Sequence, residues 1–277
     1  MTPPRDFPLT QVRGLGDVAL RWLRGERWDE AAPRQASTVM LVRDGERGTE
    51  VFMLKRVSQM AFAPSMHVFP GGGVDPRDGD AGLPWAGPSP AEWASRLGCT
   101  AAEAQMFVAA AVREVFEEVG VLLAGPSPSS PLVDPHDGSW AGVRDGLVSR
   151  DLSLAGVLRE RDLVLRSDLI VAKAHWLTPA FEPRRFDTWF FAAVMPEHQV
   201  ADGETSEAET AEWVLPQELL EAYAAGLASL LPPTVMCVEE IADAPSAVAF
   251  VRHSDDLPLI MPVVVDTPEG PAMRIDV

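Results

Sequence analysis

The sequence has 277 residues, of which 47% are apolar, and it carries 41 acidic against 23 basic residues, for a net charge of −18. This length allows one large or two small domains, and the apolar content is sufficient for a sizeable core. The negative charge argues against a surface that tracks nucleic-acid phosphates, the absence of a run of about 18 apolar residues argues against a membrane span, and two cysteines are too few for a disulfide framework.

The first 35 residues are expected to form an N-terminal extension with at most one helix, near residues 17–23. The chain does not begin with a basic region followed by an apolar core, so no secretory signal is indicated and a cytoplasmic location is expected. Residues 36–43 and 50–56 have the composition of strands and are separated by a turn-forming segment. This pattern predicts a β-hairpin.

A glycine-rich turn follows a short apolar segment that ends at Phe69 and Pro70. Gly71, Gly72 and Gly73 stand in succession there. Because glycine has no Cβ, backbone groups in such a turn can approach a ligand or a metal closely. A glycine cluster alone is weak evidence of a site, so its meaning depends on the segments that follow.

Residues 76–101 begin with proline, glycine and aspartate and then offer a short amphipathic helix over 90–97. Trp85 and Trp93 could pack this segment onto the core, or they could provide an apolar wall for a ligand. We expect the segment to form a small lid beside the site.

Three carboxylates stand in the last turns of the next predicted helix, which Gly120 ends. Glu114, Glu117 and Glu118 face the negative end of the helix dipole, and glutamates four residues apart repel each other by about 0.2–0.5 kcal/mol. A bound divalent cation would reverse both penalties, whereas the simpler interpretation is a solvated acidic face. Arg113 stands four residues before Glu117 and could hold that carboxylate in place.

Further strands are expected at 169–177 and 186–195, and an acidic loop at 204–212 leads to a helix that opens at Pro216. Residues 246–277 are expected to form a C-terminal hairpin or extension. This segment could cover the sheet or reach a second copy of the chain, so a homodimer stays open.

The glycine turn and the acidic helix together resemble the Nudix box, whose pattern is G-x5-E-x7-R-E-U-x-E-E-x-G-U with U a bulky apolar residue. Its second half is matched without a gap over residues 113–121, and Pro70-Gly71-Gly72 is similar to its usual opening. The first half departs from the pattern, because Arg113 lies 113 − 72 = 41 residues after Gly72 where the pattern requires 14, which leaves 27 extra residues. Eight positions before Arg113 stands Gln105, with Glu103 nearby, so the early glutamate has no clear counterpart.

An interrupted box resembles the Nudix branch that includes the peroxisomal coenzyme A diphosphatases. Other segments similar to that branch are 52–56, 62–64, 175–191 and 231–234. The resemblance implies an α/β fold, an α/β/α sandwich with a mixed sheet, over residues 36–245.

The resemblance also implies the chemistry. Mg²⁺ or Mn²⁺ held by Glu114, Glu117, Glu118 and a carbonyl of the Gly72 turn would promote attack of water on the diphosphate of a nucleoside diphosphate derivative. In this family a loop glutamate in a comparable place sometimes acts as general base or extra metal ligand, and two residues could serve here, Glu207 and Glu209.

Guanidinium groups bind phosphate in a bidentate manner, so three arginines are candidate phosphate ligands: Arg56, Arg184 and Arg185. Coenzyme A or an acyl derivative is one candidate substrate. An ADP-sugar, a dinucleotide cofactor or a damaged nucleotide is an alternative, and so is a nucleotide sensor that does not cleave. No nucleic acid or membrane partner is expected.

Overall fold

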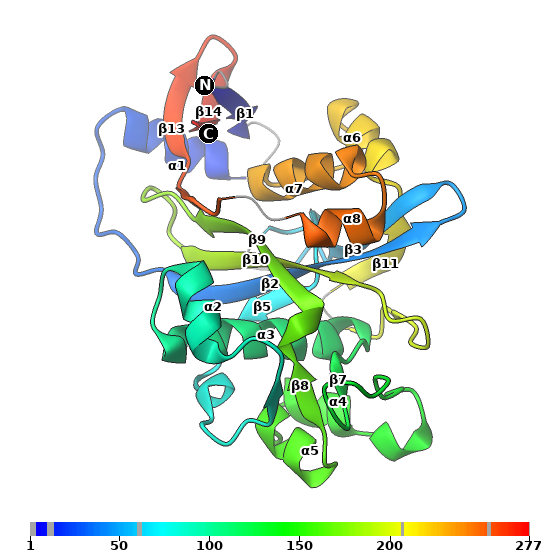
Figure 1. Ribbon diagram of the computed structural model, residues 1–277. Helices are drawn as coiled ribbons and strands as arrows, with labels where there is room; N and C mark the ends of the chain where they lie inside the picture. Colours follow the sequence, from blue (N-terminus) through cyan, green and yellow to red (C-terminus); the bar gives the residue numbers. More distant parts are fainter. Residues whose placement is uncertain (1–3, 10–13, 60–62, 206–207, 254–255, 277) are drawn as a thin grey trace.

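The computed structural model describes residues 4–9, 14–59, 63–205, 208–253 and 256–276. Its centre is a mixed eight-stranded sheet that lies between two helical layers (Figure 1). Along the main path the strands follow the order β11 (Ala208–Val214), β3 (Gly48–Arg56), β2 (Arg34–Gly45), β10 (Phe186–Val194), β9 (Ile170–Leu177) and β12 (Leu259–Ile260). Two short strands lie off this path, β4 (His67–Val68) on β3 and β5 (Gly71–Gly73) on β2.

The predicted hairpin of residues 36–56 is confirmed, because β2 and β3 pair antiparallel through Gly45 and Gly48. Successive side chains of β2 point to opposite faces of the sheet. Val39 and Leu41 belong to one core cluster, whereas Met40 and Val42 belong to the other. The alternating apolar residues of one strand therefore build both cores.

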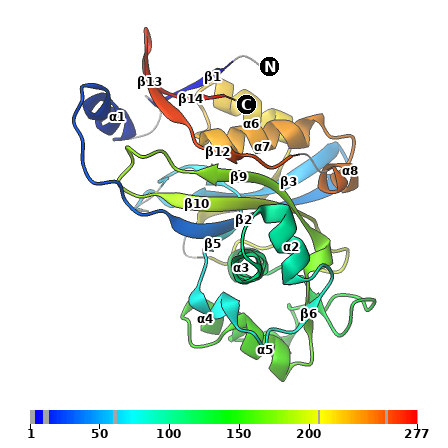
Figure 2. The ribbon, with the colours of Figure 1, turned by 60° about the vertical axis from the view of Figure 1, so that its left-hand side comes forward.

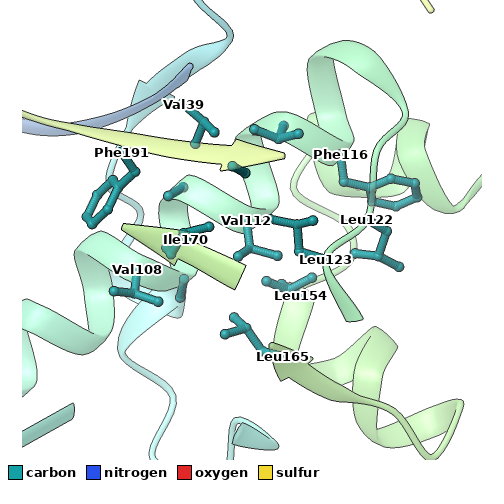
Figure 3. Packing of buried hydrophobic residues seen from close by; sticks show 14 of the residues in the cluster. Val39, Val108, Val112, Phe116, Leu122, Leu123, Leu154, Leu165, Ile170 and Phe191 are labelled. Atoms are coloured by element: carbon teal, nitrogen blue, oxygen red, sulfur yellow. The ribbon is translucent and has the colours of Figure 1, made fainter. Parts of the chain in front are cut away.

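Helix α3 (Ala101–Val119) covers one face of the sheet (Figure 2). Thr100 caps its first turn and Gly120 ends it in the left-handed conformation, with φ 72°. Val108, Val112 and Phe116 recur at four-residue spacing and point into the core beneath the sheet (Figure 3). This packing fixes the rotation of α3 about its axis, and with it the direction of the glutamates near its end.

The opposite face of the sheet is covered by α7 (Pro232–Asp243) and α8 (Ala247–Arg252), with α6 (Pro216–Ala224) beside α7. The predicted helix at Pro216 is confirmed. Two helical layers around one mixed sheet make the predicted α/β/α sandwich.

The segment predicted to be a lid is instead part of the core. It contains the 3₁₀ helix η2 (Pro76–Gly79), strand β6 (Trp85–Ala86) and helix α2 (Pro90–Leu97), the last as predicted. Helix α2 packs on α3, and the Trp93 ring is fully buried against Phe191. Burial of a tryptophan of this size anchors the segment, so the prediction of a lid was wrong.

A second, small sheet lies beyond α3 and is absent from the sequence-based expectations. Its strands are β6, β8 (Val164–Arg166) and β7 (Ala124–Gly125), and it is accompanied by α4 (Val143–Val148) and α5 (Leu154–Glu160). Two further 3₁₀ turns are η3 (Gly138–Trp140) and η4 (Ser167–Leu169).

A third sheet joins the two ends of the chain. It consists of β1 (Arg5–Pro8), β14 (Gly270–Ile275) and β13 (Val263–Thr267), the last two forming an antiparallel hairpin, and α1 (Leu15–Leu23) lies beside it. The N-terminal extension thus contains a strand as well as the expected helix. Within the described residues, no helix has the length and apolar character required to cross a membrane.

Candidate active site

A cleft with a volume of about 1090 Å³ runs from the C-terminal half of α3, past β5, to the end of β9. Three predicted glutamates line one end: Glu114, Glu117 and Glu118. Gly71, Gly72 and Gly73 of β5 line it as well. The structure therefore brings the two halves of the sequence motif into one site.

Arg113 is the centre of the hydrogen-bond network at this end. Its Nη1 donates to Glu114 Oε1 at 2.7 Å and to Glu117 Oε2 at 3.0 Å, while its Nη2 donates to the Gly73 carbonyl at 2.9 Å. Its Nε and Nη2 also donate to the two carboxylate oxygens of Asp78, at 2.9 and 3.0 Å. The guanidinium thus orients two glutamates and ties them to the glycine strand.

Asp78 occupies the position that the early glutamate of the motif would have. Counting forward from Gly72 through five intervening residues reaches 72 + 6 = 78, and only then does the extra sequence begin. Glu103 and Gln105, which the sequence left open for this role, have other partners. Glu103 caps the first turn of α3 with Thr100, and Gln105 Nε2 donates to the carbonyl of Asp80 at 2.9 Å.

The glycines of β5 allow close contact with the α3 carboxylates. The Gly71 N–H donates to Glu118 Oε2 at 2.7 Å. A Cβ on Gly71 would lie 2.5 Å from the Ser37 carbonyl oxygen, and one on Gly72 would lie 2.6 Å from Glu114 Oε2. Any larger residue at either position would therefore displace the strand or the carboxylate.

Burial changes the protonation of these carboxyl groups. It raises the pKa of Glu114 to about 7, although Arg113 opposes the shift, and it also raises the pKa of Glu117. Glu117 Oε1 is buried, and no described residue donates a hydrogen bond to it. A buried acceptor without a donor among the described residues is a natural place for a bound cation.

These features fit a divalent cation. In the described ranges the carboxylates do not converge as a ready group of three ligands, because Arg113 and Gly71 hold their oxygens. The unsatisfied Glu117 oxygen, the raised pKa of Glu114 and a hard, all-oxygen donor set each favour a bound cation. Glu114, Glu117 and Glu118 are the residues that would hold it.

Other predicted residues lie elsewhere. Arg56 lines the cleft, but Arg184 and Arg185 do not. The Arg185 guanidinium is buried behind the cleft, where Nε donates to the Thr178 carbonyl at 2.9 Å and Nη1 to Glu30 at 3.2 Å. Arg185 thus holds loops together, which corrects its assignment as a phosphate ligand.

The acidic loop is also shorter than expected. Residues from Ala208 onward form β11, which pairs with β3, and this places Glu209 3.7 Å from Lys55 and outside the cleft. Glu207 lies outside the described residues. Glu204 and Thr205, which precede it, do line the cleft.

Sequence reasoning missed several charged residues of the cleft, among them Arg77, Arg144 and Glu182. Arg144 of α4 donates from Nε to the Glu117 carbonyl at 2.8 Å and pairs with Asp202 at 2.7 Å. A cation at the last carbonyls of a helix offsets the negative end of its dipole. No local pattern marks these residues, because separate elements bring them together.

Comparisons with known proteins identify the family of the chain. The family model of the NUDT19 Nudix domain matches residues 88–241, more than half of the chain. A Caenorhabditis elegans protein named nudix hydrolase 7 is 30% identical, with 73% of this chain and 58% of that protein covered. The human acyl-coenzyme A diphosphatase NUDT19 is 29% identical, with 80% of this chain and 70% of that protein covered.

The match thus spans only part of each relative, 58% of the Caenorhabditis elegans protein and 70% of the human protein. The crystal structure of a NUDIX hydrolase from Alicyclobacillus acidocaldarius has a TM-score of 0.66 and 23% identity, and the match covers 82% of this chain and 99% of that one. The predicted Nudix fold is confirmed by this likeness.

Proposed function

We propose that this chain, which belongs to the Nudix hydrolase family, cleaves the diphosphate of coenzyme A or an acyl-coenzyme A to give 3′,5′-ADP and a 4′-phosphopantetheine product. The observation that carries the proposal is the cluster of three α3 glutamates at one end of a large cleft, two of them held by Arg113 and the third by the Gly71 N–H. The substrate class is suggested by the name of the human relative.

The charge of the cleft supports a phosphorylated substrate. Over the described residues, its lining contains six arginines against seven acidic residues, whereas the whole chain has 23 basic against 41 acidic residues. The lining arginines are Arg34, Arg56, Arg77, Arg113, Arg144 and Arg150. Basic residues are therefore concentrated where a diphosphate would be bound, and guanidinium groups suit its oxygens.

The reaction adds water to one phosphorus and breaks its bond to the bridging oxygen. A divalent cation, when bound, would neutralise charge on the diphosphate and lower the pKa of the attacking water. Arg113 would keep the Glu114 and Glu117 carboxylates oriented throughout, as its two hydrogen bonds do now. We propose Glu204, at the cleft, as the loop carboxylate that accepts the proton from water, in place of Glu209.

The test is hydrolysis of coenzyme A, acetyl-coenzyme A, NADH, ADP-ribose and nucleoside triphosphates, with and without Mg²⁺ or Mn²⁺, and with products identified by mass. Glu118→Gln should abolish turnover, and Glu103→Gln, at the other end of the same helix, should not. Release of 3′,5′-ADP supports the proposal, and cleavage of a different substrate overturns the coenzyme A assignment. Tight nucleotide binding without turnover would instead indicate a sensor.

A matched pair of variants tests the proton acceptor. Glu204→Gln should reduce kcat by about 100-fold or more, in the range of general-base losses, while Glu209→Gln leaves it unchanged. The reverse result would contradict the assignment.

A further inference from the structure

The end of the cleft along β9 and β10 is built differently from the end that holds the glutamates. The pairing of Trp176 with Thr188, and of Phe190 with Thr38, places these four residues on one face of the sheet. All four line the cleft, as does Phe186. This end therefore offers a wall of aromatic rings, which suits a flat apolar group.

Glu182 lies at the same end, after the buried anchor Phe181. The residue is only 8% exposed, yet it lines the cleft. Burial raises the pKa of its carboxyl group to about 7. In the part of the chain that the structure describes, burial and the charge of Arg185 act on this carboxyl group, and no hydrogen bond does.

Arg185, whose charge acts on Glu182, donates its hydrogen bonds to other groups. Arg185 lowers the pKa of Glu182 only through its charge, because its guanidinium donates to Thr178, Glu30 and Ala31. The Trp176 indole N–H is buried at this end as well and has no acceptor among the described residues. The Glu182 carboxyl group borders the cleft and accepts no hydrogen bond from a described residue, so a donor on a ligand in the cleft can reach it.

We propose that this end of the cleft is the subsite for the adenine base of the substrate, in which the Glu182 carboxyl oxygen accepts a hydrogen bond from the exocyclic amine. The proposal rests on the proposed function, which places the diphosphate at the glutamates and the adenosine half further along the same cleft. The base contacts the wall of Trp176, Phe186 and Phe190, and its amine supplies the donor that Glu182 lacks. The pantetheine arm then extends in another direction.

An adenine ring fits this end better than the pantetheine arm does. The arm is a flexible chain with amide groups along its length, whereas the wall is made of aromatic rings with one carboxyl group. A flat ring with a single amine at its edge matches both features. Loss of that amine would leave the buried carboxyl group unpaired, and sites of this kind discriminate strongly against such an analogue.

The experiment measures binding by calorimetry and needs no turnover. ADP is compared with purine riboside 5′-diphosphate, which has the same ring and phosphates but no 6-amino group. The intact protein should bind ADP at least about tenfold more tightly. In Glu182→Ala the two ligands should bind within about twofold of each other. Glu182→Gln should keep most of the preference, because its amide oxygen still accepts the bond.

Glu30→Ala is the matched control, since Glu30 lies nearby, pairs with Arg185 and does not line the cleft. Its preference for ADP should equal that of the unaltered chain. Equal binding of the two ligands by the unaltered chain, or a preference that survives Glu182→Ala, would overturn the proposal. So would weaker binding of 4′-phosphopantetheine, and not of ADP, in that variant.

The outcome is separable from that of the proposed function. If ADP is preferred but coenzyme A is not hydrolysed, the base subsite stands and the substrate assignment fails. If coenzyme A is hydrolysed but the amine makes no difference, the subsite fails and the substrate assignment stands.

Discussion

Replacement of Asp78 by alanine tests how the interrupted motif is held together. The Asp78 and Arg113 side chains are 2% and 8% exposed and share two hydrogen bonds, at 2.9 and 3.0 Å. Removing Asp78 leaves Arg113 paired with Glu114 and Glu117 but takes the acceptor away from two of its buried N–H groups, and breaking a buried pair of this kind destabilises proteins by about 3–5 kcal/mol. Asp78 Oδ2 also accepts a hydrogen bond from the Asp75 N–H, so the turn of η2 is weakened as well.

The assay is urea denaturation monitored by tryptophan fluorescence, with the free energy of unfolding extrapolated to water. Asp78→Ala should lower this free energy by about 3–5 kcal/mol at an unchanged m-value. Because Arg113 orients Glu114 and Glu117, kcat should also fall by about 10- to 100-fold under conditions where the variant is folded.

Asp80→Ala is the matched control. Asp80 lies two residues away in the same segment and pairs with Arg159 at 2.9 Å, but both side chains are partly exposed, at 34% and 47%. Solvent screens such a pair, so its loss should have a much smaller effect. Equal stability of the two variants would refute the view that Asp78 anchors the site.

Three other substitutions or conditions follow from the geometry. Gly71→Ala should destabilise the protein by about 1–3 kcal/mol in a thermal melt, because its Cβ would lie 2.5 Å from the Ser37 carbonyl oxygen, whereas Gly73→Ala, which has open space, should be nearly neutral. Burial raises the pKa of Glu114 from 4.5 to about 7, so the native state retains a proton that the unfolded state releases, and the metal-free protein should lose up to about 3 kcal/mol between pH 4.5 and pH 7. Urea denaturation in EDTA measures this slope, and an identical slope in Glu114→Gln would contradict it. Trp93→Ala should lower the free energy of unfolding by about 3–5 kcal/mol without a change in KM. A raised KM at unchanged stability would instead support the interpretation of this segment as a lid.

Local patterns in the sequence were sufficient where local physics decides the structure. The hairpin of β2 and β3, helix α2 and the end of α3 at Gly120 all follow from turn residues, capping residues and apolar spacing within short windows. Strand β1 could not be found in this way. It has four residues, and its partner β14 lies at the other end of the chain.

The candidate site shows the same division. The order of Arg113, Glu114, Glu117 and Glu118 along α3 is itself the motif, so these residues were found. Asp78 was missed because the position of the early glutamate was counted back from Arg113, which lies after the inserted residues. Counting forward from Gly72, which lies before them, reaches Asp78.

Arg185 shows why charge and spacing alone are insufficient to assign a phosphate ligand. Its guanidinium is buried and donates to backbone carbonyls and to Glu30. Burial and partners are properties of the folded chain that no short window reveals. The same reasoning applies to Glu182, whose value as a ligand group depends on the absence of a partner among the described residues.

A box split by 27 residues can still assemble, because its geometry depends on contacts and not on chain length. Between Asp78 and Arg113 stand 113 − 78 − 1 = 34 residues where the pattern has seven, and closing the longer loop costs about 1.4 kcal/mol more in chain entropy. Trp93, fully buried within that loop, contributes about 1.5–3 kcal/mol by its burial. The burial of Trp93 therefore offsets the entropy cost of closing the longer loop. The buried pair of Asp78 with Arg113 then joins the two halves of the site.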